Sequence, residues 1–216
     1  MSKKTKITYA MSRRRRSTIL AVCFLLIAVL VWLDHSHVGR NQQRQHKSEE
    51  QARAYDFEKY HKKTFTVVNV VDGDTIDINI PDSKYGHTRI RLWGVDTPET
   101  KKPESPVMYF GPEATEFTCE LALGKQVKVF LENHRTRGNY GRLLAYVQLP
   151  DGRFLNEVLL LEGFAYADLR FSHSFSHKYQ QLEAVARSQN KGLWEKVKRE
   201  QLPKWRQRMS PNLLTK

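Results

Sequence analysis

The sequence predicts a β-rich α+β domain, a five-stranded barrel with three helices, preceded by one transmembrane helix. Two observations lead to this prediction. An uninterrupted apolar run occupies residues 18–33, and from residue 64 onward short β-branched runs alternate with turn residues and three amphipathic stretches. The 40% apolar composition is enough for one core, and Gly, Pro and Cys are unexceptional, which excludes a disordered, collagen-like or disulfide-stapled chain.

The N-terminal residues predict a membrane anchor followed by a tether. The basic residues 1–16 are expected to stay cytoplasmic by the positive-inside rule, and residues 17–33 are just long enough to span a bilayer as an uncleaved signal anchor. No small-x-small cleavage motif follows Leu33, although secretion after cleavage remains the alternative. Residues 34–60 are polar and are expected to form a solvated linker. The rest of the chain is therefore expected to be periplasmic or extracellular.

The folded domain is expected over residues 61–195. Its five strands are predicted at residues 64–71, 75–80, 89–95, 126–131 and 143–149, and its three helices at residues 111–123, 156–162 and 178–190. The last helix is expected to bury Leu182 and Val185. Five strands with interspersed helices in so short a domain fit a small, partly open barrel of the oligonucleotide/oligosaccharide-binding (OB) type, which covers or closes its sheet edges.

The net charge of +13 lies at the two ends of the chain. Residues 1–16 hold seven Lys and Arg and no acid, residues 196–216 hold seven and one Glu, and the residues between hold 22 charges of each sign. Residues 196–216 are expected to form a basic tail that helps to hold a polyanion. Because the middle is neutral, its function has to be argued from local groups of residues.

Three short stretches carry candidate chemistry: Asp72-Gly73-Asp74-Thr75, then RLWGVDTPET at residues 91–100, and Tyr140-Gly141-Arg142. Each alone is typical of a turn or a helix start. Together and in this order, with YFGPEA at residues 109–114, they resemble the staphylococcal nuclease (thermonuclease) family. The similarity covers the predicted domain, from about residue 65 to residue 194, and none of the anchor.

The resemblance implies a calcium site. In the family, the positions that match Asp74 and Asp96, and the carbonyl that matches Thr97, hold Ca²⁺. The residue types suit this role, because hydrolysis of a phosphodiester requires a cation to offset phosphate charge. Oxygen-only ligands favour Ca²⁺, and extracellular Ca²⁺ sites work at affinities of about 10⁻⁴ to 10⁻³ M.

The resemblance also implies catalytic and substrate-binding residues. Arg91 and Arg142 match the two arginines that bracket the scissile phosphate, where a guanidinium can pair bidentately with phosphate oxygens. Glu99 matches the candidate general base that orients or deprotonates water. Tyr140 matches an aromatic residue near the bound nucleotide, and Phe171 stands where a second aromatic residue can stack on a base.

Two functions follow from these residues. The leading hypothesis is a calcium-dependent endonuclease that cuts DNA and RNA with little sequence preference and leaves 3′-phosphate ends, acting as a monomer without a protein partner. The alternative is a non-catalytic OB-fold module that only binds nucleic acid, since fold alone does not give function. A further pair, His173 and His177, has the i, i+4 spacing of a zinc site but no nearby third ligand, and a polar surface loop is expected there.

Overall fold

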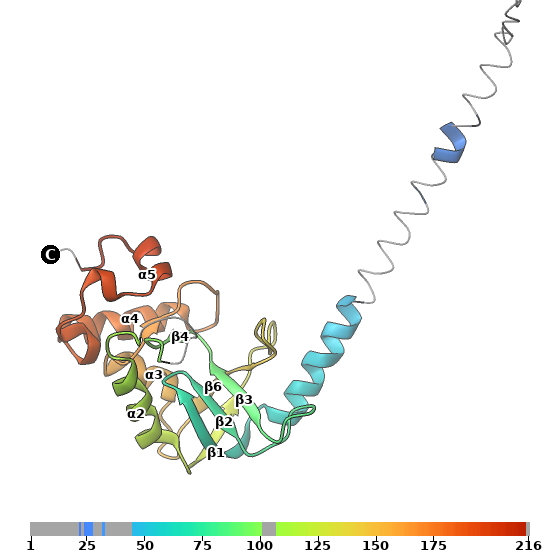
Figure 1. Ribbon diagram of the computed structural model, residues 1–216. Coiled ribbons are helices and arrows are strands. Elements are labelled where there is room, and N and C mark those ends of the chain that lie inside the picture. Colours follow the sequence, from blue (N-terminus) through green and yellow to red (C-terminus); the bar gives the residue numbers. More distant parts are fainter. Residues whose placement is uncertain (1–21, 23, 28–31, 33–44, 101–106, 215–216) are drawn as a thin grey trace, which may run out of the picture. The chain divides into compact units, whose positions relative to one another are not determined.

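The computed structural model describes residues 22, 24–27, 32, 45–100 and 107–214, and the chain falls into two compact units, residues 1–52 and 53–216 (Figure 1). The predicted anchor at residues 17–33 lies largely outside the described residues; those described within it are helical. Among the described residues, no helix is both long and apolar enough to cross a membrane. The second unit holds the predicted barrel.

Five strands of the second unit form a closed barrel in the order β1-β2-β3-β6-β5. Their bounds are Lys63–Asp72 for β1, Thr75–Ile78 for β2, Thr88–Leu92 for β3, Gln126–Phe130 for β5 and Leu143–Gln148 for β6. β3 and β6 pair in parallel, and the other four pairs are antiparallel. The predicted five-stranded barrel is confirmed, but it is closed and not partly open, so none of these five strands is left as an open edge.

Alternation along the strands explains how the barrel fills its interior. In β3, Thr88, Ile90 and Leu92 are buried, whereas Arg89 is exposed and Arg91 is half-buried on the other face. β6 departs from alternation, because its first five residues are all buried. Helix α3 (Leu155–Leu161) covers its outer face, so both sides of this strand meet apolar residues.

Three helices occupy the predicted places. α2 (Gly111–Ala122) begins with Pro in its first turn, α3 follows β6, and α4 (Ser176–Ser188) packs on α3. The expectation that Val185 is buried is wrong, since its side chain is 39% exposed. α4 instead buries Tyr179, Glu183 and Ala186, a helical face that includes a charge.

The compact unit includes residues on both sides of the range 61–195. On the N-terminal side, residues 53–60 are helical, and Asp56 and Tyr60 are buried in a segment expected to be a linker. The Tyr60 hydroxyl lies 3.0 Å from that of Thr88 on β3. A buried aromatic ring and a buried carboxylate with partners are reasons for a segment to fold onto the barrel rather than to remain solvated.

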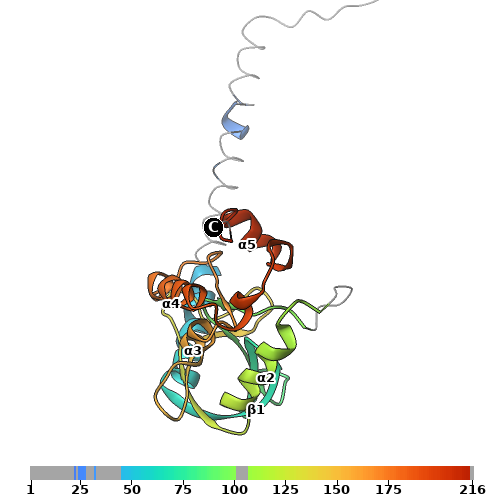
Figure 2. The same cartoon turned by 90° about the vertical axis from the view of Figure 1, so that its left-hand side faces the viewer.

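On the C-terminal side, the basic segment also folds. Short 3₁₀ helices η1 (Gly192–Glu195) and η2 (Arg199–Gln201) lead to α5 (Lys204–Met209), which Figures 1 and 2 show at one end of the unit with β1 toward the other. Leu202 and Trp205 are buried in a second apolar cluster with Tyr166 and Trp194. The expected tail at residues 196–216 therefore packs its apolar side chains on the domain as far as it is described.

A second, two-stranded sheet carries the DTPE motif. Gly94 has a positive φ of 78° and turns the chain out of the barrel, and β4 (Val95–Asp96) then pairs antiparallel with β7 (Tyr166–Ala167). A Cβ atom at Gly94 would lie 2.4 Å from the ring of His173. The turn therefore needs glycine, and it places Asp96 near the N-terminal end of β2 and the C-terminal end of β3.

Candidate active site

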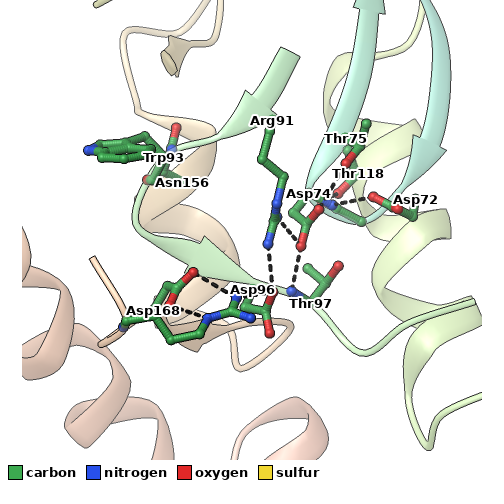
Figure 3. Close-up of polar contacts among 12 residues, drawn as sticks. Asp72, Asp74, Thr75, Arg91, Trp93, Asp96, Thr97, Thr118, Asn156 and Asp168 are labelled. Carbon is green, nitrogen blue, oxygen red and sulfur yellow. Dashed lines mark hydrogen bonds and ion pairs between the residues drawn. The ribbon is translucent and has the colours of Figure 1, made fainter. Parts of the chain in front are cut away.

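Arg91 lies between two carboxylates at the end of the barrel (Figure 3). The turn between β1 and β2 carries Asp74, the register of β2 on β3 places Thr75 opposite Arg91, and β4 carries Asp96. The Arg91 Nη1 atom forms an ion pair with Asp74, and Nη2 donates a hydrogen bond of 2.6 Å to Asp96 Oδ1. Three strand ends thus bring together residues that are separated by 22 positions in the chain.

Hydrogen bonds fix the Asp74 carboxylate. Its Oδ2 accepts the backbone N–H of Thr97 at 2.8 Å, and its Oδ1 accepts the Thr75 hydroxyl at 3.0 Å (Figure 3). Burial raises the pKa of Asp74 to about 6 even though Arg91 opposes the shift. A further positive charge nearby would therefore stabilise the ionised form of Asp74.

Asp96 has three donors. Its Oδ1 accepts from Arg170 at 2.9 Å as well as from Arg91, and its Oδ2 accepts the indole N–H of Trp205 at 2.8 Å. Burial raises the pKa of Asp96 too, against the effect of Arg91. Arg170 also binds Asp168, so a chain of alternating charges runs across this part of the site.

All eight residues predicted for the site line one cleft of about 420 Å³. They are Asp74, Arg91, Asp96, Thr97, Glu99, Tyr140, Arg142 and Phe171. The first five come from the strand ends and the segment after β4, and the next two from the loop before β6. Their roles stay predictions, but the structure brings them to one place.

The loop before β6 is anchored from outside the predicted domain. Arg137 pairs with Asp56 at 2.6 Å and with Asp82, and its Nη1 also donates to the carbonyl of Gly141 at 3.0 Å. The Thr136 hydroxyl donates to Asp56 at 2.7 Å. The buried Asp56 of the N-terminal helical segment therefore holds the loop that carries Tyr140 and Arg142.

The two loop side chains that face the cleft differ in burial, because Tyr140 is exposed and Arg142 is half-buried. The Tyr140 side chain is 86% exposed, and the Arg142 guanidinium lies 5.7 Å from its ring centroid. Within the described residues, Arg142 forms no ion pair with a carboxylate. Partial burial lowers the pKa of Arg142, and Arg91 contributes to the shift. This cation is therefore available to a ligand.

An aromatic wall flanks the same cleft. Trp93 and Phe171 stack with ring centroids 6.0 Å apart, and the Arg135 guanidinium lies 5.6 Å from the Phe171 ring. Phe171 is 43% exposed, whereas Trp93 is buried. Phe171 thus lines the cleft with an exposed ring, and the stacked Trp93 ring holds Phe171 in position.

The expected surface loop is present, with Ser172 and Ser174 exposed on either side of His173, but the histidine itself departs from the expectation. His173 is buried, its Nδ1 lies 3.1 Å from the Tyr146 hydroxyl, and burial lowers its pKa. The Tyr146 hydroxyl also donates to the buried Glu132. His173 therefore supports the aromatic wall, and its close approach to Gly94 leaves no room beside it for a side chain at that position.

Comparisons with known proteins agree with this geometry. The family model described as staphylococcal nuclease homologue matches residues 89–196, half of the chain. This chain belongs to the staphylococcal nuclease family. It is 36% identical over 135 residues to the thermonuclease of Staphylococcus hyicus, covering 62% of this chain and 77% of the relative. It is also 32% identical over 199 residues to the endonuclease YncB of Bacillus subtilis, covering 88% and 92%.

The donor chemistry fits the cation that the staphylococcal nuclease family implies. Asp74 and Asp96 offer only hard oxygen atoms. Asp74 is buried, Asp96 is half-buried, and both carboxylates have raised pKa values and gain from a nearby cation. Among the described residues, no group of three or more His, Cys, Asp and Glu side chains is placed to hold a metal ion. The site would therefore rely on two carboxylates, a backbone carbonyl and water, which fits a weak hard-cation site.

Four residues of the site were given no role by the sequence motifs. Asp72 caps the turn, because its Oδ1 accepts the N–H of Asp74 at 3.2 Å, and Asp168, Arg170 and Trp205 surround Asp96. Asp72 stands in the DGD motif and could have been found as a turn residue. The other three lie 72 to 109 positions after Asp96, and no local pattern connects them to it.

Proposed function

We propose that the protein is a calcium-dependent endonuclease that hydrolyses phosphodiester bonds of DNA and RNA with little sequence preference and leaves 3′-phosphate ends. One observation carries the proposal: a single cleft joins two carboxylates, the buried Asp74 and the half-buried Asp96, to Arg142, a cation without a carboxylate partner among the described residues. The two carboxylates can bind a metal cation, and that cation together with Arg142 suits an anionic ligand such as a phosphodiester. The endonuclease and thermonuclease relatives support the same class of reaction.

Asp74, Asp96 and the carbonyl of Thr97 would hold Ca²⁺, which supplies positive charge to the phosphate when it is bound. Arg142 would bind the phosphate by its planar fork of donors. Arg91 can assist, because its guanidinium lines the same cleft and has five N–H donors, more than its pairs with Asp74 and Asp96 use. Glu99, which also lines the cleft, would orient or deprotonate the attacking water.

The exposed aromatic residues account for a substrate range without sequence preference. Stacking of a base on Tyr140 or Phe171 needs only a π face, which every base has. The cleft includes Arg135 beside Phe171, and its charge is satisfied by no carboxylate among the described residues. A single-stranded segment with phosphates near Arg142 and bases on the two rings fits these contacts.

We also propose where the enzyme works. Residues 17–33 would anchor the chain with residues 1–16 in the cytoplasm, and the nuclease unit would face the periplasm or the exterior, where calcium is sufficient for a weak site. Secretion after cleavage of the N-terminal segment is the alternative. The unit would act as a monomer without a protein partner.

The test is a digestion assay with the purified full-length chain. Plasmid DNA, single-stranded DNA and RNA are incubated with Ca²⁺, with Mg²⁺ or with chelator, and the product ends are identified by enzymatic labelling. We expect cleavage of all three with Ca²⁺, none with chelator, and 3′-phosphate ends. Binding of nucleic acid without cleavage under any ion would contradict the proposal and favour the non-catalytic OB-fold module.

A further inference from the structure

The C-terminal segment donates a hydrogen bond to a residue of the proposed cation site. Trp205, in α5, is 9% exposed, and its indole N–H lies 2.8 Å from Asp96 Oδ2, although 109 positions separate the two residues. The family model ends at residue 196, so Trp205 lies beyond the matched residues. The contact is therefore not part of the motif that identifies the family.

Several contacts fix the Trp205 ring in place. The next residue, Arg206, forms a buried ion pair with Glu183 on α4, and Glu183 also accepts the N–H of Ala167 at 2.7 Å. Ala167 pairs with Val95, the neighbour of Asp96. The Arg170 guanidinium lies 4.7 Å from the Trp205 ring centroid. The indole is thus tied through α4 and β7 to the strand that carries Asp96.

Hydrogen bonds occupy three of the four lone pairs of the Asp96 carboxylate. Asp96 Oδ1 accepts from both Arg91 and Arg170, which uses its two lone pairs. Oδ2 accepts only the indole N–H of Trp205 among the described residues, which leaves one lone pair. A carboxylate held at both oxygen atoms cannot rotate freely about its Cβ–Cγ bond.

We propose that Trp205 is a positioning residue of the cation site, which holds the Asp96 carboxylate so that the remaining lone pair of Oδ2 is available to the bound cation. The inference rests on the proposed function, because it requires Asp96 to bind the cation. Residues that orient a metal ligand by a hydrogen bond typically change metal affinity by about 10- to 100-fold when they are replaced. A ring that serves only to fill the second apolar cluster would have no such effect.

The first experiment measures Ca²⁺ affinity without any substrate. The full-length wild-type chain, Trp205→Phe and the matched control Trp194→Phe are titrated with Ca²⁺ by calorimetry in a mild detergent. Trp194 is buried in the same cluster, and its indole N–H has no hydrogen-bond partner among the described residues. We expect Trp205→Phe to weaken Ca²⁺ binding about tenfold, and Trp194→Phe to leave the affinity unchanged. The thermal unfolding midpoints of the two variants report the loss of packing in each.

The second experiment uses the wild-type chain and is therefore independent of folding defects in a variant. The indole N–H resonances are followed by NMR during the same Ca²⁺ titration, after assignment through their side-chain and backbone connectivities. We expect the Trp205 indole resonance to move with Ca²⁺ and that of Trp194 to stay. Equal Ca²⁺ affinity in wild type and Trp205→Phe, an equal loss in both variants, or a Trp205 resonance that ignores Ca²⁺ would overturn the inference alone. Absence of Ca²⁺ binding by the wild type would overturn the proposed cation site and the inference with it.

Discussion

The two halves of the cleft balance their charges in opposite ways. In the strand half, Asp74, Arg91 and Asp96 are well shielded from solvent and paired with one another. In the loop half, Tyr140 is exposed and Arg142 has no carboxylate partner among the described residues. The strand half is therefore preorganised by its own ion pairs, whereas the loop half keeps the Tyr140 ring and the Arg142 guanidinium available for a ligand.

Burial explains why the halves differ. A charge removed from water needs a compensating charge and hydrogen bonds, so the carboxylates at the strand ends recruit Arg91, Arg170 and Trp205. Arg142 is only half-buried, so its guanidinium keeps contact with water and needs no carboxylate partner. Mutations in the strand half are therefore expected to affect both stability and activity, and mutations in the loop half activity alone.

The largest effect is expected from Arg91→Ala. The change leaves the buried Asp74 and the half-buried Asp96 without their shared cation, and breaking a buried pair by removing one partner typically costs about 3–5 kcal/mol of unfolding free energy. Denaturant unfolding measures the loss, and the digestion assay should show no cleavage. Arg153→Ala is the control, because Arg153 pairs with Asp151 on an exposed turn and should be close to wild type in both assays. Wild-type stability in Arg91→Ala would contradict the assignment of this half.

The second effect, Arg142→Ala, is expected to separate activity from stability. Removing one donor to developing charge typically lowers a rate by about 10²- to 10³-fold, while the exposed loop loses no paired charge. Single-turnover cleavage and thermal unfolding, measured on the same sample, check this expectation. Arg142→Lys should recover little, because an ammonium group cannot pair bidentately with phosphate. Near-normal turnover in Arg142→Ala would remove Arg142 from the catalytic residues.

The smallest effect is expected from Tyr140→Ala. Loss of a base-stacking ring costs about 1–3 kcal/mol of binding free energy, so KM for single-stranded DNA should rise while kcat changes little. Steady-state kinetics with oligonucleotides separates the two constants, and Tyr140→Phe should retain the wild-type KM. If Tyr140→Ala lowered kcat with unchanged KM, the loop half would contribute to chemistry and not to binding.

The barrel was predictable because its signals are local. Period-two alternation, the DGD turn and glycines at helix ends predict five strands and three helices close to their observed bounds. The eight predicted site residues line one cleft because the motifs follow strand ends, and strand ends of a small barrel lie close together.

The missed features depend on contacts between distant residues. Apolar periodicity predicted a buried Val185, yet α4 buries Glu183, whose charge meets Arg206 and the N–H of Ala167. The sequence predicted Asp56 to lie in a polar linker, because its partner Arg137 is 81 positions away in the chain. In each case a distant partner offsets the cost of burying a charged residue. The hydropathy pattern along the chain does not identify that partner.

The most direct test of the division between the halves is to measure Ca²⁺ binding by calorimetry on Asp96→Asn and Arg142→Ala in the full-length chain, with single-turnover cleavage on the same samples. The account predicts that Asp96→Asn loses Ca²⁺ binding and cleavage together, and that Arg142→Ala binds Ca²⁺ like the wild type yet cleaves at least about 10²-fold more slowly. Wild-type Ca²⁺ affinity in Asp96→Asn, or loss of Ca²⁺ binding in Arg142→Ala, would contradict it.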